Sequence, residues 1–187
     1  MKKLLEVKNL CKDGILHRVS FAVEAGEMVA VMGPSGSGKS TLLYNIAGLD
    51  QPTAGEVWLD GTEIAGLPED EKAALRLHRM GFVFQQMNML SNLNLIDNIL
   101  LPAVQAQKGK RNQSRSKDAL IRDAKDWMKK LSIEELAERD IAQVSGGQLQ
   151  RACICRSMIN APKILFADEP TGALNMSAAG EVMDEFE

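Results

Sequence analysis

Apolar and polar residues alternate in the first part of the chain. Leu5 and Val7 alternate with charged residues, and a second alternating segment covers residues 19–23. A period of two residues predicts half-buried strands. Residues 28–32 instead form a continuous apolar run, which predicts a strand covered on both faces in a parallel sheet. We therefore expect antiparallel β structure first and a parallel strand after it.

A glycine-rich turn follows this run and leads into a predicted helix. The apolar residues between 42 and 47 recur at helical spacing, and Gly48 is placed to end the helix in the left-handed conformation. Further on, Val57 and Leu59 alternate before Asp60-Gly61, and residues 81–84 predict another short buried strand. The local pattern is thus strand, loop, helix, followed by two more strands.

The middle of the chain is predicted to be helical. Apolar residues recur every three or four positions from Leu120 to Leu131, and Ser132 with Glu135 has the spacing of a capping box for a further helix. Ala161-Pro162 then breaks the chain before a strand at residues 163–167. A β layer, a helical insert and a return to parallel sheet indicate an α/β fold.

Composition limits the class of protein. The chain has 187 residues, of which 45% are apolar and 25% charged, which fits one globular domain. A net charge of −3 argues against a general nucleic-acid binder. The apolar runs are too short to span a bilayer, the N-terminus lacks the apolar stretch of a signal peptide, and three cysteines without a CxxC pair suit a reducing compartment.

The glycine-rich turn matches a phosphate-binding P-loop. Its glycines allow backbone N–H groups to turn toward phosphate oxygens, and the helix N-terminus adds positive potential. Lys39 is expected to reach the β and γ phosphates, and Ser40 to ligate Mg²⁺. The motif consists of Gly33, Pro34, Ser35, Gly36, Ser37, Gly38, Lys39, Ser40 and Thr41. By itself it leaves kinases, GTPases, helicases and transporters possible.

Two later motifs narrow the choice. Ser145, Gly146, Gly147 and Gln148 open a predicted helix, so that Ser145 is either a plain N-cap or part of an anion site. Within 20 residues follows an apolar strand that ends in Asp168-Glu169, the arrangement of a Walker B motif.

Together these motifs resemble the ABC transporter ATPase family over nearly the whole chain. Residues 81–86 and 168–174 are similar to the bacterial branch of lipoprotein-releasing, macrolide-export, antimicrobial-peptide-resistance and cell-division ATPases. The resemblance implies a P-loop NTPase (RecA-like) core with an antiparallel β subdomain and a helical signature-motif subdomain at about residues 86–160. It also implies a homodimer that sandwiches two ATP molecules.

The resemblance assigns roles to the motifs. Residues 145–148 of one subunit would bind the γ-phosphate held by the other. Asp168 would hold the Mg²⁺ shell, with Ser40 and Gln85 as further metal ligands, and Glu169 would orient or deprotonate the attacking water. Gln85 matches the family's Q-loop, which senses Mg²⁺ and the water.

The implied function is that of an ATP-binding subunit. It would couple ATP binding and hydrolysis to substrate movement by transmembrane permease subunits, from the inner, cytoplasmic face of the membrane. The apolar segment at residues 87–100 is either a docking site for such a partner or ordinary core. The alternative function is a nucleotide-binding regulatory module without useful turnover.

The chain departs from the family in three places. Residues 9–15, where the family places an aromatic ring that stacks on adenine, contain none, so base recognition is either weaker or falls to Cys11, Lys12 or His17. The D-loop aspartate is replaced by Asn175. The family's switch histidine would lie beyond Glu187, so we expect a chain truncated at its C-terminus that binds Mg-nucleotide but hydrolyses it slowly.

Overall fold

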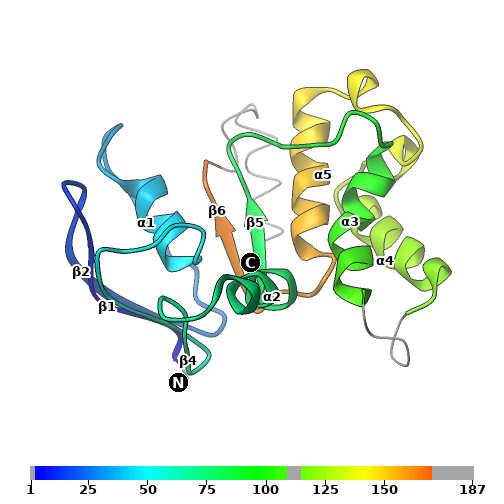
Figure 1. Ribbon diagram of the computed structural model, residues 1–187. Coiled ribbons are helices and arrows are strands. Elements are labelled where there is room, and N and C mark those ends of the chain that lie inside the picture. The colour runs from blue at the N-terminus through cyan, green and yellow to red at the C-terminus, as the bar shows by residue number, and fades with distance from the viewer. Residues whose placement is uncertain (1–2, 109–114, 170–187) are drawn as a thin grey trace. The chain divides into compact units, whose positions relative to one another are not determined.

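The computed structural model describes residues 3–108 and 115–169 (Figure 1). The chain divides into two compact units, Met1–Arg76 and Leu77–Glu187, and each is described by itself. We call them unit 1 and unit 2. Helix α2 (Glu69–Arg79) crosses the boundary between them along the chain.

Unit 1 contains an antiparallel sheet with the strand order β2-β1-β3-β4. The alternating segments around Val7 and Val57 form its two central strands, where these two residues are paired and buried, and the segment 19–23 lies in the edge strand β2. A two-residue turn at Asp60 and Gly61 joins the last two strands, with the positive φ angles of 48° and 83° that a type I′ turn requires. The strands are β1 (Lys3–Lys12), β2 (Leu16–Glu24), β3 (Ala54–Leu59) and β4 (Thr62–Glu63).

Helix α1 (Lys39–Ile46) follows the P-loop sequence, as predicted. Gly48 has a φ of 64° and ends the helix, with its N–H donating to the Asn45 carbonyl. The Leu49 N–H donates to the Tyr44 carbonyl, which completes a Schellman motif. The left-handed glycine predicted at this position is therefore confirmed.

The strand predicted at residues 28–32 is not found. None of the strands among the described residues pairs with this run, and four of its side chains are about half exposed or more, with Met32 at 89%. An apolar run becomes a strand only where neighbouring strands accept and donate its backbone hydrogen bonds. In unit 1 the run pairs with neither edge strand of the four-stranded sheet, β2 or β4, so its backbone lacks such partners there.

Unit 2 contains a parallel pair of strands and a group of helices (Figure 1). β5 (Met80–Val83) pairs with β6 (Ile164–Ala167), so the strands predicted at residues 81–84 and 163–167 are both confirmed. Gly81 lies where a side chain would meet the Ser157 carbonyl oxygen at 2.6 Å, because helix α5 (Gly146–Met158) passes close to the strand.

Three helices enclose the main apolar cluster of unit 2, α3 (Leu95–Gln107), α4 (Lys117–Lys130) and α5 (Gly146–Met158). Leu95 and Ile99 on α3 are fully buried in it, as are Ala124 and Met128 on α4. For the helical part of residues 87–100, core packing is therefore the correct alternative. No helix in the described part of the chain is long and apolar enough to cross a membrane.

The capping box predicted at Ser132 is wrong. Ser132 has a φ of 54° and lies just after α4, where its N–H donates to the Lys129 carbonyl and that of Ile133 donates to the Met128 carbonyl. These bonds form a second Schellman motif, which needs the left-handed conformation that an N-cap residue does not adopt. Only short 3₁₀ turns follow, at Glu134–Leu136 and Ile141–Gln143.

Candidate nucleotide and catalytic sites

The P-loop of unit 1 winds around the side chain of Lys39. The Lys39 ammonium donates to the carbonyl oxygens of Gly33 (2.9 Å) and Pro34 (3.0 Å). Gly36 and Gly38 have φ angles of 78° and 90°, which L side chains rarely adopt. The loop thus holds the Lys39 ammonium against its own backbone. Its tight turn depends on the positive φ angles of Gly36 and Gly38.

Helix α1 begins without a side-chain cap. Its N-cap residue is Gly38, and no side chain accepts a hydrogen bond from the first turn as a cap. The initial N–H groups of a helix need an acceptor, and an anion such as phosphate supplies one. The chemistry of this helix end therefore fits a phosphate group.

The turn between β1 and β2 lies against this helix end. A Cβ atom added to Gly38 would come within 2.8 Å of Ile15 Cγ2 and 3.3 Å of Leu16 Cδ2. The position of the turn and the position of the P-loop are therefore coupled by direct contact.

In unit 2, the strand ends bring Gln85 and Glu169 together. Val83 pairs with Ala167, and the Asp168 N–H donates to the Val83 carbonyl at 2.8 Å, which extends the parallel ladder by one step. Gln85 Nε2 then donates to Glu169 Oε2 at 2.8 Å. Two predicted catalytic residues, 84 positions apart in the chain, are thus in direct contact.

Glu169 has a left-handed backbone with a φ of 51°. This conformation is uncommon for residues other than glycine, and such residues concentrate at functional sites. It turns the chain sharply at the end of β6, directly after Asp168. Two carboxylates thus follow each other at the carboxyl end of a strand.

The segment after Gln85 is held by two side chains that the sequence analysis missed. Arg156 on α5 donates to the carbonyl oxygens of Met87 (2.7 Å) and Asn88 (2.9 Å). Asn98 on α3 is completely buried, accepts from the Leu90 N–H at 2.7 Å, and donates to the Leu90 carbonyl at 3.0 Å. Segment 87–100 contains six polar residues, so its sequence alone does not single out Asn98.

The N-terminus of α5 is capped by its own sequence. The Ser145 hydroxyl accepts from the Gln148 N–H at 3.3 Å, and Gln148 Oε1 accepts from the Ser145 N–H at 3.0 Å. This reciprocal pair is a capping box. The N-cap role of Ser145 is confirmed, and the anion role remains a prediction.

Cys153 and Arg156 lie side by side on α5. Burial raises the pKa of the Cys153 thiol to about 11, and the nearby Arg156 charge lowers it by less. The thiol therefore stays protonated at neutral pH and donates to the Met87 carbonyl at 3.4 Å. This agrees with a packing role for Cys153.

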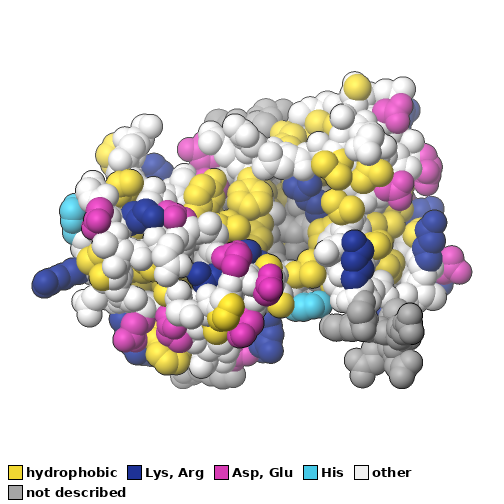
Figure 2. Space-filling model, viewed as in Figure 1, with side chains coloured by type: hydrophobic (Ala, Val, Ile, Leu, Met, Phe, Trp, Pro, Cys, Tyr) yellow, Lys and Arg dark blue, Asp and Glu magenta, His cyan; other side chains and the backbone are white. Residues whose placement is uncertain are grey.

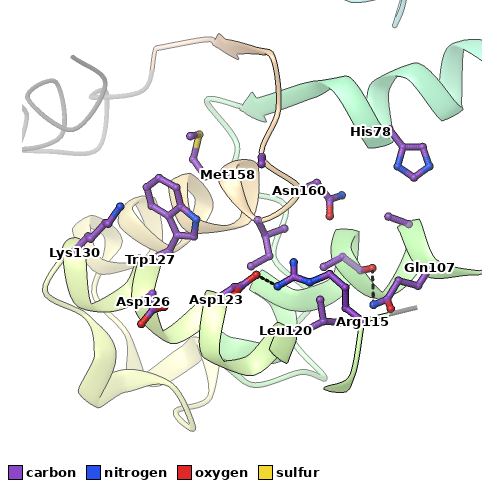
Figure 3. A pocket seen from close by; sticks show the side chains of 14 residues that line it. His78, Gln107, Arg115, Leu120, Asp123, Asp126, Trp127, Lys130, Met158 and Asn160 are labelled. Atoms are coloured by element: carbon purple, nitrogen blue, oxygen red, sulfur yellow. Dashed lines mark hydrogen bonds and ion pairs between the residues drawn. The ribbon is translucent and has the colours of Figure 1, made fainter. Parts of the chain in front are cut away.

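A separate hollow of about 460 Å³ lies in unit 2, between α3, α4 and the end of α5 (Figure 3). Arg115 forms an ion pair with Asp123 on its wall, and the Lys130 ammonium lies 4.4 Å from the ring centroid of Trp127. Arg115, Asp123 and Lys130 therefore already have partners within the wall. None of the predicted site residues lines this hollow.

Comparison with known proteins identifies the family. The sequence profile of the ABC transporter family matches residues 16–172. The chain is 36% identical over its whole length to the lipoprotein-releasing system ATP-binding protein LolD 1 of Chlorobium chlorochromatii (strain CaD3), covering 74% of that protein. It is 40% identical over 92% of its length to the ABC transporter ATP-binding protein YknY of Bacillus subtilis (strain 168), covering 72% of that relative.

Two further matches support the assignment. The macrolide export ATP-binding/permease protein MacB of Campylobacter jejuni is 41% identical over 97% of the chain, which covers 28% of that protein. A dimeric structure of the ATP-binding cassette MJ0796 with ADP and Pi superposes with a TM-score of 0.87, at 36% identity, covering 96% of this chain and 80% of that one. The chain therefore belongs to the ABC transporter family, as one of its ATP-binding subunits. The family, the branch and the ABC cassette fold predicted from the sequence are confirmed. Asn175 and the end of the chain lie outside the described residues.

Proposed function

We propose that this chain binds Mg-ATP and hydrolyses it with Glu169 and Gln85, and so powers substrate movement by membrane subunits. The contact between Gln85 and Glu169 carries the hydrolytic part of this proposal. A carboxylate beside an amide at the ends of paired strands has the chemistry needed to hold and deprotonate a water molecule.

The P-loop supports nucleotide binding. Its uncapped helix end and Lys39 supply donors and positive charge for phosphate oxygens. We assign phosphate binding to residues 33–41, and γ-phosphate binding from the other subunit of a dimer to residues 145–148. For the latter role, the Ser145 hydroxyl, which accepts from the Gln148 N–H, would donate its own O–H to the phosphate.

Magnesium binding is proposed from the chemistry of three side chains. Mg²⁺ prefers oxygen ligands, and bound to a nucleotide it neutralises phosphate charge. Ser40 offers a hydroxyl, Asp168 a carboxylate and Gln85 an amide oxygen. The Gln85 nitrogen already donates to Glu169, so its oxygen is the end suited to a metal or to water.

The proposed partners are a second copy of this chain and a permease. The dimeric MJ0796 cassette supports the first, and the word permease in the name of MacB supports the second. Such a subunit would lie on the cytoplasmic face of the membrane. The segment after Gln85 is the proposed docking site, because Leu90 is 45% exposed beside a backbone held firmly by Arg156.

The test compares Mg-ATP hydrolysis by the wild-type chain and by Glu169→Gln. Hydrolysis is measured as the rate of phosphate release, and Mg-ADP binding is measured in parallel. Loss of the catalytic base should lower turnover by about 10²–10⁴-fold, with binding retained. Glu135→Gln, an exposed carboxylate on the same unit, is the matched control and should leave both unchanged. The same assay shows whether wild-type turnover is slow, as the sequence predicts.

Binding without hydrolysis in the wild type would support the regulatory module instead. Equal turnover of the wild type and Glu169→Gln would remove Glu169 from the mechanism.

A further inference from the structure

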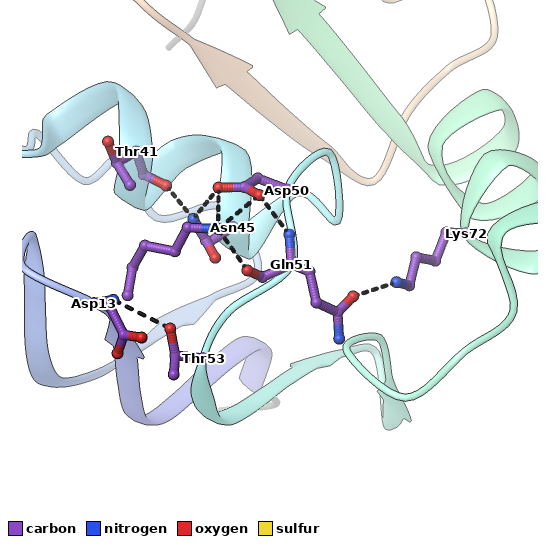
Figure 4. Close-up of polar contacts among 8 residues, drawn as sticks. Asp13, Thr41, Asn45, Asp50, Gln51, Thr53 and Lys72 are labelled. Carbon is purple, nitrogen blue, oxygen red and sulfur yellow. Dashed lines mark hydrogen bonds and ion pairs between the residues drawn. The ribbon is translucent and has the colours of Figure 1, made fainter.

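A polar network in unit 1 connects the end of β1 with the P-loop helix (Figure 4). At its centre, Asp50 accepts hydrogen bonds from the Lys12 ammonium (2.8 Å), from Asn45 Nδ2 (3.2 Å) and from the Gln51 N–H (2.8 Å). Asn45 Nδ2 also donates to the carbonyl oxygen of Thr41 at 2.8 Å. The network therefore ends on the backbone of the P-loop motif itself.

The Lys12 ammonium is held by acceptors of unit 1. It lies 2.8 Å from both carboxylate oxygens of Asp50 and 2.8 Å from the Gln51 carbonyl oxygen. Two of its three N–H groups are donated to Asp50 and to Gln51, and the second Asp50 oxygen completes the ion pair. Of the residues expected to read the base, Lys12 is thus engaged within unit 1.

The same residue also starts the turn that touches the P-loop. The Ile15 N–H donates to the Lys12 carbonyl at 2.9 Å, and Ile15 packs against Gly38. The first turn of the P-loop helix is therefore held at two points, at Gly38 through this turn and at Thr41 through Asn45 and Asp50. Asn45 is only 2% exposed, so its position is fixed by packing as well.

We propose that Lys12 and Asp50 are positioning residues that hold the P-loop in its phosphate-binding shape, and that Lys12 does not contact the base. The Lys12 hydrogen bond is the main reason that the pKa of the Asp50 carboxyl is lowered, so Asp50 is ionised at neutral pH. This inference rests on the proposed nucleotide site, because it concerns the geometry of the same loop.

The experiment compares Mg-ADP with magnesium tripolyphosphate, which has phosphates but neither ribose nor base. Both are titrated calorimetrically into the wild type, Lys12→Met and Asp50→Asn, well below their unfolding temperatures. Positioning of the loop predicts that both variants bind both ligands about fivefold more weakly, the size expected for a partly exposed ion pair. Asp50→Asn keeps the shape of the side chain, so it still tests the proposal if Lys12→Met folds poorly.

Lys3→Met is the matched control. Lys3 forms an ion pair with Glu6 at 2.8 Å on the same strand, but this pair lies outside the network of Asp50. Its removal should leave the affinity for both ligands unchanged.

Three results would overturn the inference. Weaker ADP binding with unchanged tripolyphosphate binding would mean that Lys12 contacts the nucleoside. A lower unfolding temperature with unchanged affinities would mean that the network only stabilises the fold. A wild type that binds neither ligand would remove the proposed function itself, and the inference with it.

Discussion

The N-termini of α1 and α5 are both predicted to bind phosphate, yet their first turns differ in structure. α1 begins at Gly38 without a side-chain cap, whereas α5 begins at Ser145 with a complete capping box. The first arrangement has no side-chain cap, which suits an external anion, and the second supplies acceptors for the Ser145 and Gln148 N–H groups from within the sequence. The shape of the α1 end must therefore come from its surroundings, namely Ile15 and the network of Asp50. The α5 end holds its own shape.

The largest expected effect concerns the N-terminus of α1, which has no side-chain cap. Gly38→Ala should weaken Mg-ADP binding by about 100-fold, or about 2.8 kcal/mol, because the alanine meets both a left-handed backbone and the Ile15 side chain. Calorimetric titration measures this loss. Affinity within about threefold of the wild type would show that the loop does not depend on this geometry.

A smaller effect tests the capped end. Ser145→Ala removes the hydroxyl that accepts from Gln148 and should lower the free energy of unfolding by about 1 kcal/mol. Urea unfolding measures the loss. Because Gln148→Ala disrupts the same capping box, the double variant should lose less than the sum of the single variants. Additive losses would contradict a reciprocal cap.

Gly146→Ala reverses the expectation for Gly38. A Cβ atom at Gly146 meets nothing within 4 Å, and the residue begins a regular helix. Alanine there should raise the free energy of unfolding by about 0.5 kcal/mol through its higher helix propensity. A destabilised Gly146→Ala protein in thermal unfolding would mean that the two helix ends are more alike than their contacts indicate.

The smallest effect is a dependence on pH. The pKa of Asp50 is lowered in the folded state, chiefly by the Lys12 hydrogen bond, so its contribution is present above the unfolded pKa and is lost as pH falls through the folded pKa. Asp50→Asn should therefore reduce stability by about 0.5 kcal/mol or less between pH 5 and 7, and by nothing in stronger acid. Denaturant unfolding across this range measures the difference. The α5 cap contains no titratable group, so the loss from Ser145→Ala should not change with pH over the same range.

Local sequence signals predicted much of the fold. Alternation of apolar residues predicted β1 and β2, helical spacing predicted α1 and α4, and Ser145 was correctly interpreted as an N-cap. These features depend on residues within a few positions of one another. The confirmed family motifs are of the same short-range kind.

The failures concern features that local pattern does not determine. The run at residues 28–32 has strand composition, but pairing depends on neighbours elsewhere in the chain. Ser132 has the spacing of a capping box, yet the end of α4 requires a left-handed residue there. Arg156 binds the Asn88 carbonyl across 68 positions, and no local signal predicts such a contact. The network of Asp50 was missed for the same reason.

The pairing of Gln85 with Glu169 has a consequence for the order of folding. The two residues are 84 positions apart, and their contact extends the parallel pairing of β5 and β6. Long-range parallel pairing forms slowly, because a large loop must close before its contacts stabilise it. During synthesis β5 emerges long before β6, so the helices between them have time to form first. The proposed catalytic pair is therefore assembled among the last features of unit 2. Any delay in docking β6 leaves a folded helical core in which Gln85 and Glu169 are not yet in contact.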